Sequence, residues 1–196
     1  SILVTGAAGY IGRNLCRALL KAGYRVKGSL MTEKEREFLP DGVEPFVTGE
    51  IDGATDWSPA LQSVESVVHL AARVHQKEEK SDASLALFRR TNTDAPAALA
   101  EQALANGARS FVFLSSVAVH GLNKTEEPLR IDSPIRPATN YGLSKWEAEE
   151  KLTALFENAN ASLTILRPTM VYGPQAPGNF ARLTKMVRAG IPIPLG

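Results

Sequence analysis

Short apolar runs rich in β-branched residues alternate along the chain with longer amphipathic or Ala-rich stretches. A buried strand is a short apolar run, whereas a surface helix repeats its apolar positions every three to four residues. The apolar runs cover residues 2–5, 24–26, 45–48, 66–70, 111–114 and 163–166. The stretches between them that favour helices cover residues 15–22, 32–39, 94–104 and 141–158. The pattern therefore predicts an α/β fold with a doubly wound parallel sheet.

The regular alternation ends at residue 166. Prolines and glycines are frequent after that point, and only residues 180–189 favour a further helix. So short a segment is too small to bury a hydrophobic core of its own. We therefore expect one α/β domain, residues 1–166, followed by the beginning of a longer region, residues 167–196.

Composition narrows the partners and the compartment. The chain has 22 Lys and Arg against 21 Asp and Glu, a formal charge of +1, so no overall field attracts nucleic acid or an anionic membrane. No apolar run is long enough to span a bilayer, and no signal-peptide pattern is present. The lone Cys16 argues for a reducing compartment. His69, His75 and His120 lack the spacing of metal ligands. We expect a cytoplasmic protein without metal, nucleic-acid or membrane partners.

Three glycines follow the first predicted strand at the mouth of the first predicted helix. They are Gly6, Gly9 and Gly12. A pyrophosphate needs backbone N–H donors at close range and the positive end of a helix dipole, which side chains at the first two positions would block. A side chain at Gly12 would hold the helix away from the strand. An ordinary tight turn is the alternative, but the spacing and context favour a dinucleotide.

The identity of the dinucleotide stays open at this point. An NAD site places a carboxylate at the end of the second strand, where it bonds the ribose 2′-hydroxyl. Here that strand ends in Gly-Ser-Leu-Met, residues 28–31, and Glu33 comes late. Arg13, beside the third glycine, is suited either to a 2′-phosphate or to solvent. The residues therefore allow NAD or NADP.

Tyr141 and Lys145 are four residues apart, so a helix places them on one face. A phenol titrates near ~10, and a fixed cation nearby stabilises the phenolate that general base catalysis requires. Ser116 follows a buried strand at the carboxyl edge of the sheet, where it is able to bond the reacting oxygen. A surface Tyr and Lys and a plain strand end are the alternatives. Together the three residues predict a catalytic group.

These segments resemble the extended short-chain dehydrogenase/reductase superfamily, in particular the nucleotide-sugar epimerases and reductases of the NAD-dependent epimerase/dehydratase family. The resemblance covers nearly the whole chain. Its motifs are the glycine segment 5–12, His-Leu-Ala-Ala at 69–72, Asn92, Ser-Ser at 115–116, Tyr-Gly-Leu-Ser-Lys at 141–145, and Leu-Arg-Pro at 166–168 leading to Val-Tyr-Gly-Pro at 171–174. It implies a Rossmann domain and makes region 167–196 the start of a substrate-binding region.

The resemblance also implies roles for particular residues. It makes Ser116, Tyr141 and Lys145 catalytic. The residues that it implies for the cofactor, NAD or NADP, are Gly6, Gly9, Tyr10, Ile11, Gly12, Glu50, Ile51, Leu70, Ala71, Ala72, Asn92, Tyr141, Lys145 and Pro168. Those that it implies for a UDP-sugar substrate are Ser116, Val117, Tyr141, Asn179 and Leu195. A homodimer formed by the Ala-rich helix and the Tyr-Lys helix is implied as well.

Departures from the family pattern narrow the chemistry. Family dehydratases carry an Asp-Glu pair directly after the catalytic hydroxyl, whereas this chain has Val117 and Ala118, which argues against dehydration. Met170 stands where the family frequently has a phosphate-contacting Asn. We expect a 4-epimerase of a UDP-hexose or UDP-N-acetylhexosamine, acting through a transient 4-keto intermediate with tightly bound cofactor. An NAD(P)H-dependent reductase of a nucleotide-linked 4-keto sugar and a non-catalytic dinucleotide sensor remain alternatives.

Overall fold

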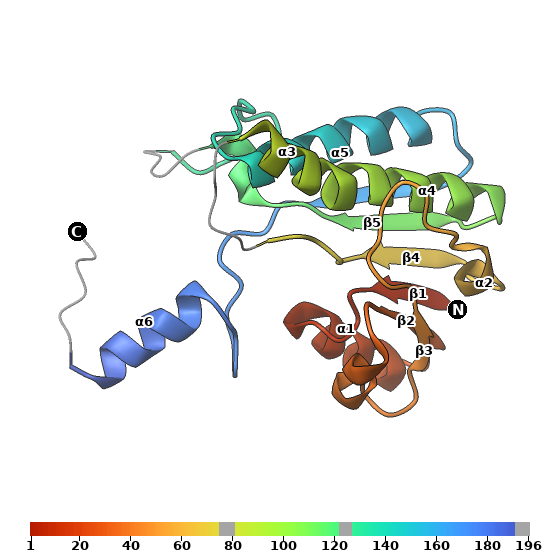
Figure 1. The fold of residues 1–196 in the computed structure, drawn as a ribbon, viewed down its shortest axis with the longest axis horizontal. Coiled ribbons are helices and arrows are strands. Elements are labelled where there is room, and N and C mark those ends of the chain that lie inside the picture. Colours follow the sequence, from red (N-terminus) through yellow and green to blue (C-terminus); the bar gives the residue numbers. More distant parts are fainter. Residues whose placement is uncertain (75–80, 122–126, 191–196) are drawn as a thin grey trace.

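A computed structural model describes residues 1–74, 81–121 and 127–190. The strands form a single parallel sheet in the order β3-β2-β1-β4-β5-β6 (Figure 1). Their bounds are β1 Ile2–Thr5, β2 Val26–Leu30, β3 Glu44–Val47, β4 Ser66–His69, β5 Ser110–Leu114 and β6 Ser162–Leu166. The strand order reverses between β1 and β4. The predicted doubly wound α/β fold is therefore confirmed.

Helices cover both faces of the sheet. One face carries α3 (Asp82–Arg89), α4 (Ala95–Ala105) and α5 (Asn140–Phe156), and the opposite face carries α1 (Tyr10–Lys21) and the 3₁₀ helix η1 (Glu33–Phe38) (Figure 1). The shorter elements are α2 (Ser58–Leu61), the π-helical turn η2 (Arg90–Asp94) that joins α3 to α4, and the 3₁₀ turn η3 (Val117–His120). Helix α6 (Asn179–Arg188) stands apart from both layers (Figure 1).

The central strands are apolar on both faces because each face is covered. Leu3 and Val4 are consecutive residues of β1, and neither is exposed. Leu3 packs with Leu99 and Phe111 on the side of α4 and α5, whereas Val4 packs with Cys16 on the side of α1. This two-sided burial explains why the strands appear in the sequence as continuous apolar runs rather than as alternating patterns.

Several element boundaries differ from the predicted ones. β2 occupies Val26–Leu30 instead of residues 24–26, since Lys27, Gly28 and Ser29 interrupt its apolar run although the strand is largely buried. The predicted helix at 32–39 is the 3₁₀ helix η1, and α1 begins five residues earlier than predicted. Helix α3 and the π-helical turn were not predicted. The last strand ends at Leu166, where the regular alternation was expected to end.

No helix within residues 1–74, 81–121 and 127–190 combines the length and apolar character that crossing a membrane requires.

Gly12 allows α1 to lie directly against the turn that follows β1. A Cβ atom at this position would overlap the carbonyl oxygen of Gly6 and lie 2.8 Å from the Cα atom of Ala7. Both neighbours are backbone atoms, which cannot rotate away as a side chain can. The close packing of helix and strand that the sequence predicted for this glycine is therefore present.

We predict that Gly12→Ala destabilises the protein by at least about 2 kcal/mol, as overpacking against backbone does. Helix propensity alone predicts the opposite sign, because Ala normally stabilises a helix interior by about 1 kcal/mol relative to Gly. Gly107→Ala is a useful control, since it adds a Cβ in open space and tests only the cost of a positive φ. Urea unfolding monitored by circular dichroism measures both, and a stabilised Gly12→Ala variant would contradict the packing argument.

Candidate active site

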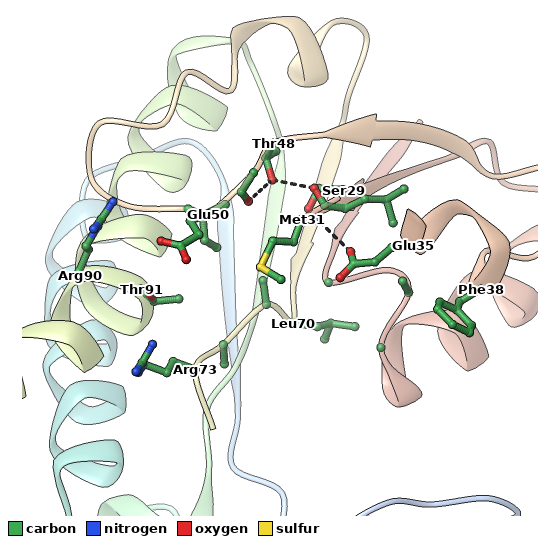
Figure 2. Close-up of a pocket in the computed structure, with 18 of the residues that line it drawn as sticks. Ser29, Met31, Glu35, Phe38, Thr48, Glu50, Leu70, Arg73, Arg90 and Thr91 are labelled. Carbon is green, nitrogen blue, oxygen red and sulfur yellow. Dashed lines mark hydrogen bonds between the residues drawn. The ribbon is translucent and has the colours of Figure 1, made fainter. Parts of the chain in front are cut away.

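A cleft of about 590 Å³ opens at the carboxyl ends of β1 to β4 (Figure 2). Ligands of open α/β sheets bind at this edge, next to the point where the strand order reverses. Several residues predicted to hold the cofactor line the cleft, namely Gly6, Gly9, Glu50, Ile51, Leu70, Ala71 and Ala72. The structure thus brings together segments that follow three different strands.

The turn after β1 leaves room for a ligand to approach the backbone closely. Gly6 has a φ of +64°, which favours glycine, and a Cβ there would lie 3.1 Å from the backbone nitrogen of Ala71 across the cleft floor. Gly9 precedes the first turn of α1 with extended backbone, so the positive end of the helix faces the cleft. These features fit the pyrophosphate of a dinucleotide, since α1 begins beside a stretch of the turn where Gly6 and Gly9 present no side chain to the cleft.

Thr5 ties the ends of β1 and β4 beneath the cleft. Its hydroxyl accepts hydrogen bonds from the backbone N–H groups of Leu70 and Ala71, each at 3.1 Å. With both acceptor positions occupied, the hydroxyl donates its own proton to Nδ1 of His69, at 3.0 Å. His69 is fully buried, and burial together with the positive charge of Lys145 lowers its pKa to about 3. His69 is therefore a neutral structural residue with its proton on Nε2.

Asn92 lies outside the cleft lining but shapes the loop behind it. Its Oδ1 accepts from the backbone N–H of Arg73 at 2.8 Å, and its Nδ2 donates to the carbonyl of Arg73 and to the hydroxyl of Ser144, each at 3.1 Å. The residue sits in the π-helical turn η2, a distortion that is frequent at functional sites. Asn92 thereby connects the loop after β4 to α5.

The two predicted catalytic hydroxyls meet at the carboxyl end of β5. Ser116 caps η3, where its hydroxyl accepts from the backbone N–H of Ala118 at 3.1 Å. The Ser116 side chain also lies near the phenol of Tyr141, in the first turn of α5, where its hydroxyl lowers the pKa of the phenol. The Tyr141 ring is further held by an edge contact with Phe88, with 6.4 Å between ring centroids. The structure thus brings the two residues together, and their catalytic role stays a prediction.

Gly142 makes this meeting possible and was not singled out from the sequence. A Cβ on Gly142 would lie 2.6 Å from the carbonyl oxygen of Ala118 in η3. A larger residue would push α5 away from η3 and separate Tyr141 from Ser116. The glycine that follows the tyrosine was the available signal, but only the contact partner shows why it is needed.

Lys145 occupies a different position from the one its spacing suggests. The side chain is buried, its ammonium donates to the carbonyl oxygen of Leu114 at 2.9 Å, and it lies 4.5 Å from the centroid of the Phe113 ring. Burial lowers the pKa of Lys145 to about 7, against the opposing influence of Glu149. The lysine is thus held beneath the end of β5.

The influences on the pKa of Tyr141 do not include Lys145, so the expectation that this lysine makes the phenol more acidic stays a prediction. Burial raises the pKa of Tyr141, and the hydrogen bond from Ser116 is the influence that lowers it. The physical reason is that the ammonium of Lys145 is directed to the Leu114 carbonyl. Ser116 is therefore the side chain that favours the phenolate among the influences on the Tyr141 pKa.

A buried ion pair lies one helical turn beyond Lys145. Glu149 is 2% exposed and receives two donors of Arg167, with Nη2 to Oε2 at 2.6 Å and Nε to Oε1 at 3.0 Å. The hydroxyl of Ser115, next to Ser116, also donates to Glu149. This arrangement joins α5 to the carboxyl ends of β5 and β6. Neither Glu149 nor Ser115 was assigned a role from the sequence.

The remaining predicted residues are placed as follows. Tyr10, Ile11 and Gly12 begin α1, and the backbone N–H of Val117 donates to the carbonyl of Pro168 at 3.0 Å. Asn179 is the first residue of α6, and Leu195 and His75 lie outside the described residues. Neither Tyr141, Lys145 nor Pro168 is part of the cleft lining in the part of the chain that the structure describes. Their contacts with a cofactor or substrate stay predictions.

Some features were not foreseen from the sequence. Glu35, Arg73 and Arg90 line the cleft. Glu35 comes from η1, and its Oε2 accepts from the backbone N–H of Met31 at 2.7 Å, so a carboxylate does reach the end of β2. The sequence predicted a helix at residues 32–39, and that prediction did not indicate that the Glu35 carboxylate reaches the end of β2. Within the described residues, no three His, Cys, Asp or Glu side chains gather as metal ligands.

A model of the NAD-dependent epimerase/dehydratase family matches residues 2–192. The chain belongs to this family. It is 39% identical to a UDP-glucose 4-epimerase of Vibrio cholerae over its whole length and 59% of that protein. It is 31% identical, over 97% of its length and 54% of the other protein, to an N-acetyl-α-D-glucosaminyl-diphospho-ditrans,octacis-undecaprenol 4-epimerase of Escherichia coli O157:H7.

Solved structures of this family share the fold. The UDP-glucuronic acid 4-epimerase of Bacillus cereus in complex with NAD matches with a TM-score of 0.79 and 27% identity, over 97% of this chain and 63% of that one. The chain thus spans little more than half the length of the curated relatives named above.

We predict that Glu149→Gln lowers the free energy of unfolding by about 2 to 3 kcal/mol. Removing one charge of a buried pair leaves the other uncompensated, and the value is at the lower end because the Arg167 side chain is 23% exposed. Glu147→Gln, on the same helix, removes an exposed pair with Arg89 and is expected to cost less than about 1 kcal/mol. Equal urea midpoints for the two variants would refute the buried pair's importance.

Lys145 is expected to make stability depend on pH near neutrality. Its folded-state pKa of about 7 lies below that of an unfolded lysine, so the unfolded chain takes up the proton first as pH falls from about 10.5. The contribution to stability is therefore present at high pH and declines toward pH 7.

Between pH 7 and 9 the wild-type protein should gain about 1 kcal/mol per pH unit relative to Lys145→Met. Cys16, whose pKa burial raises to about 11, is present in both proteins, so its titration cancels in this comparison. Unfolding free energies from urea titrations at several pH values provide the test. Parallel pH curves for the two proteins would show that the lysine is not held in a desolvated position.

Proposed function

We propose that the protein containing this chain is a nucleotide-sugar 4-epimerase that uses tightly bound NAD and acts on a UDP-hexose or UDP-N-acetylhexosamine. The observation that carries the proposal is that Ser116 and Tyr141 lie together at the carboxyl edge of the sheet that also bears the glycine turn. Catalytic hydroxyls and a dinucleotide cradle on one edge are the parts that reversible oxidation of a sugar hydroxyl requires.

The cofactor assignment is supported by the shape and charge of the cleft. Gly6 and Gly9 leave the space that a pyrophosphate needs, and Glu50 and Ile51 line the part of the cleft after β3. When bound, NAD supplies a hydride acceptor and donor. The relative of known structure that was crystallised with NAD is consistent with this choice.

Tyr141 is proposed to move the proton. As C4 of the sugar is oxidised, the phenolate oxygen of Tyr141 takes the proton of the C4 hydroxyl, and it returns the proton when the 4-keto group is reduced from the opposite face. Ser116 bonds the reacting oxygen and steadies the negative charge on Tyr141. The hydride is removed and returned in each cycle, so the reaction has no net oxidation.

The named relatives support 4-epimerisation rather than a particular sugar. All three carry that reaction in their names, with glucose, glucuronic acid or N-acetylglucosamine as the sugar and UDP or a lipid diphosphate as the carrier. The feature common to these substrates is a hexose on a diphosphate. We propose a UDP-linked hexose for this protein, with Val117 among the residues that contact it.

We also propose a cytoplasmic homodimer formed through α4 and α5. Helix α4 is rich in alanine, and the small, partly exposed Ala98 allows another helix to approach closely.

The decisive experiment incubates the full-length protein with UDP-glucose, UDP-galactose and their N-acetylhexosamine counterparts without added nucleotide. Epimerisation detected by chromatography, with no change in reduced-nicotinamide absorbance, is expected. Tyr141→Phe should reduce kcat at least about 100-fold while NAD remains bound, because general acid–base catalysis is worth that much. The matched control is Tyr24→Phe, since Tyr24 is exposed and remote from the sheet edge.

Two results would contradict the proposal. Strict dependence on added NADH or NADPH would indicate a 4-keto-sugar reductase instead. Turnover of Tyr141→Phe within a few-fold of wild type would refute the catalytic role of the phenol and favour a dinucleotide sensor.

A further inference from the structure

Phe88 contacts both a residue of the cleft and the phenol ring of Tyr141. It is 1% exposed and is the residue that α3 buries, whereas its neighbours Leu87 and Arg89 are exposed. Its ring makes an edge contact with the ring of Tyr141, with 6.4 Å between centroids and 66° between planes. Arg73, which lines the cleft (Figure 2), places its guanidinium 5.8 Å from the centroid of the Phe88 ring. One buried ring thus connects the cleft with the proposed catalytic edge.

The segment around Phe88 is tied to α5 by hydrogen bonds. Asn92 bonds both backbone groups of Arg73, and its Nδ2 also donates to the hydroxyl of Ser144 in α5. The hydroxyl of Thr93 donates to the carbonyl of Ser144 at 2.8 Å. Asn92 and Thr93 belong to η2, which continues directly from α3. Helix α3 is therefore fixed against α5 one turn beyond Phe88.

The backbone and the ring of Tyr141 are fixed by different contacts. The approach of Gly142 to the carbonyl of Ala118 fixes the distance between α5 and η3. The direction of the phenol depends in addition on the side-chain torsions of Tyr141, which a backbone contact does not set. A general base works when its oxygen lies about 2.6–3.2 Å from the group whose proton it takes. The Phe88 ring, packed against the ring of Tyr141, restricts this remaining freedom.

We propose that Phe88 is a positioning residue, which holds the Tyr141 phenol in the direction that proton transfer requires. The inference rests on the proposed function for the reaction that the phenol serves. A misplacement of about 1 Å caused by a residue remote from the chemistry costs about 100-fold in rate. Phe88 bonds neither substrate nor cofactor in this role, so its loss should slow the chemical step and leave binding nearly unchanged.

The first experiment observes the Tyr141 ring by NMR, in full-length protein with ¹³C-labelled tyrosine rings. Tyr141→Phe identifies the signal by removing it. Phe88→Leu keeps an apolar side chain without the ring, so the Tyr141 signal should shift and its order parameter should fall. Phe156→Leu is the matched control and should leave the signal unchanged. Phe156 is also buried, contacts the ring of Phe111 at 5.9 Å, and lies 15 residues further along α5, about 22 Å away.

The second experiment measures epimerisation of UDP-glucose and UDP-N-acetylglucosamine, each with hydrogen or deuterium at C4. Phe88→Leu should lower kcat about tenfold or more, while KM and the affinity for NAD stay within about twofold of wild type. The isotope effect on kcat should rise, because the chemical step then limits turnover more than product release does. Phe156→Leu should match wild type within about twofold in kcat and show the same isotope effect.

These readouts separate positioning from a folding defect. A smaller folded fraction lowers kcat but changes neither KM nor the isotope effect. Phe88→Met fills the space with an adaptable apolar side chain and no ring, so it provides the same comparison if Phe88→Leu folds poorly.

The outcomes also separate this inference from the proposed function. If wild type epimerises neither sugar nucleotide, the proposed function fails, and the NMR measurement still decides whether Phe88 holds the phenol. If wild type is active but Phe88→Leu leaves the order parameter of Tyr141 unchanged, Phe88 does not position the ring and the proposed function stands. A wild-type kcat in Phe88→Leu would likewise overturn the inference alone.

Discussion

The contact between α5 and η3 is the constraint on which the proposed catalytic edge of the sheet depends. The two elements touch through backbone, at Gly142 and the carbonyl of Ala118. Because nothing larger than hydrogen fits between them, the distance from Tyr141 to Ser116 is set by main-chain geometry rather than by flexible side chains. The hydroxyl of Thr139, which accepts from the N–H of Gly142, fixes the first turn of the same helix. Tyr141, the group proposed to move the proton, is thus held beside Ser116 with little freedom to separate from it.

Buried charge gives this edge a second kind of rigidity. Lys145 and Glu149 are both almost inaccessible to water, and their helix is joined to β5 and β6 through Leu114, Ser115 and Arg167. Charged groups are costly to bury, and here each has a hydrogen-bonding partner. Displacing one of them would leave another charged group buried without its partner. The network favours one arrangement of strand ends over all alternatives. That uniqueness is what a site for directed hydride and proton transfer needs.

The sequence predicted the sheet, its parallel order and the glycine turn because these depend on local signals. Apolar runs mark two-sided burial, and glycine spacing marks a close approach of backbone. The strand at Val26–Leu30 was missed in part because Lys27 and Ser29 break its pattern, while Lys27 reaches the carbonyl of Gln62 at 2.9 Å from within the sheet. Contacts between distant segments gave no such signal. The helical spacing suggested that Lys145 acts on Tyr141. The Leu114 carbonyl that receives the Lys145 ammonium lies on β5, and only the fold reveals this contact. The return of Glu35 to the end of β2 was hidden for the same reason.

The three hydrogen bonds of the Thr5 hydroxyl affect how the floor of the cleft responds to a change of pH. A hydroxyl with three partners holds the neighbouring imidazole in a single tautomer, and the low pKa of His69 keeps that ring uncharged throughout the physiological range. Acidification of a cell would leave the floor beneath the glycine turn electrically unchanged. The ammonium of Lys145, whose pKa of about 7 lies within that range, is instead under β5, on the side of the proposed chemistry rather than of the glycine turn.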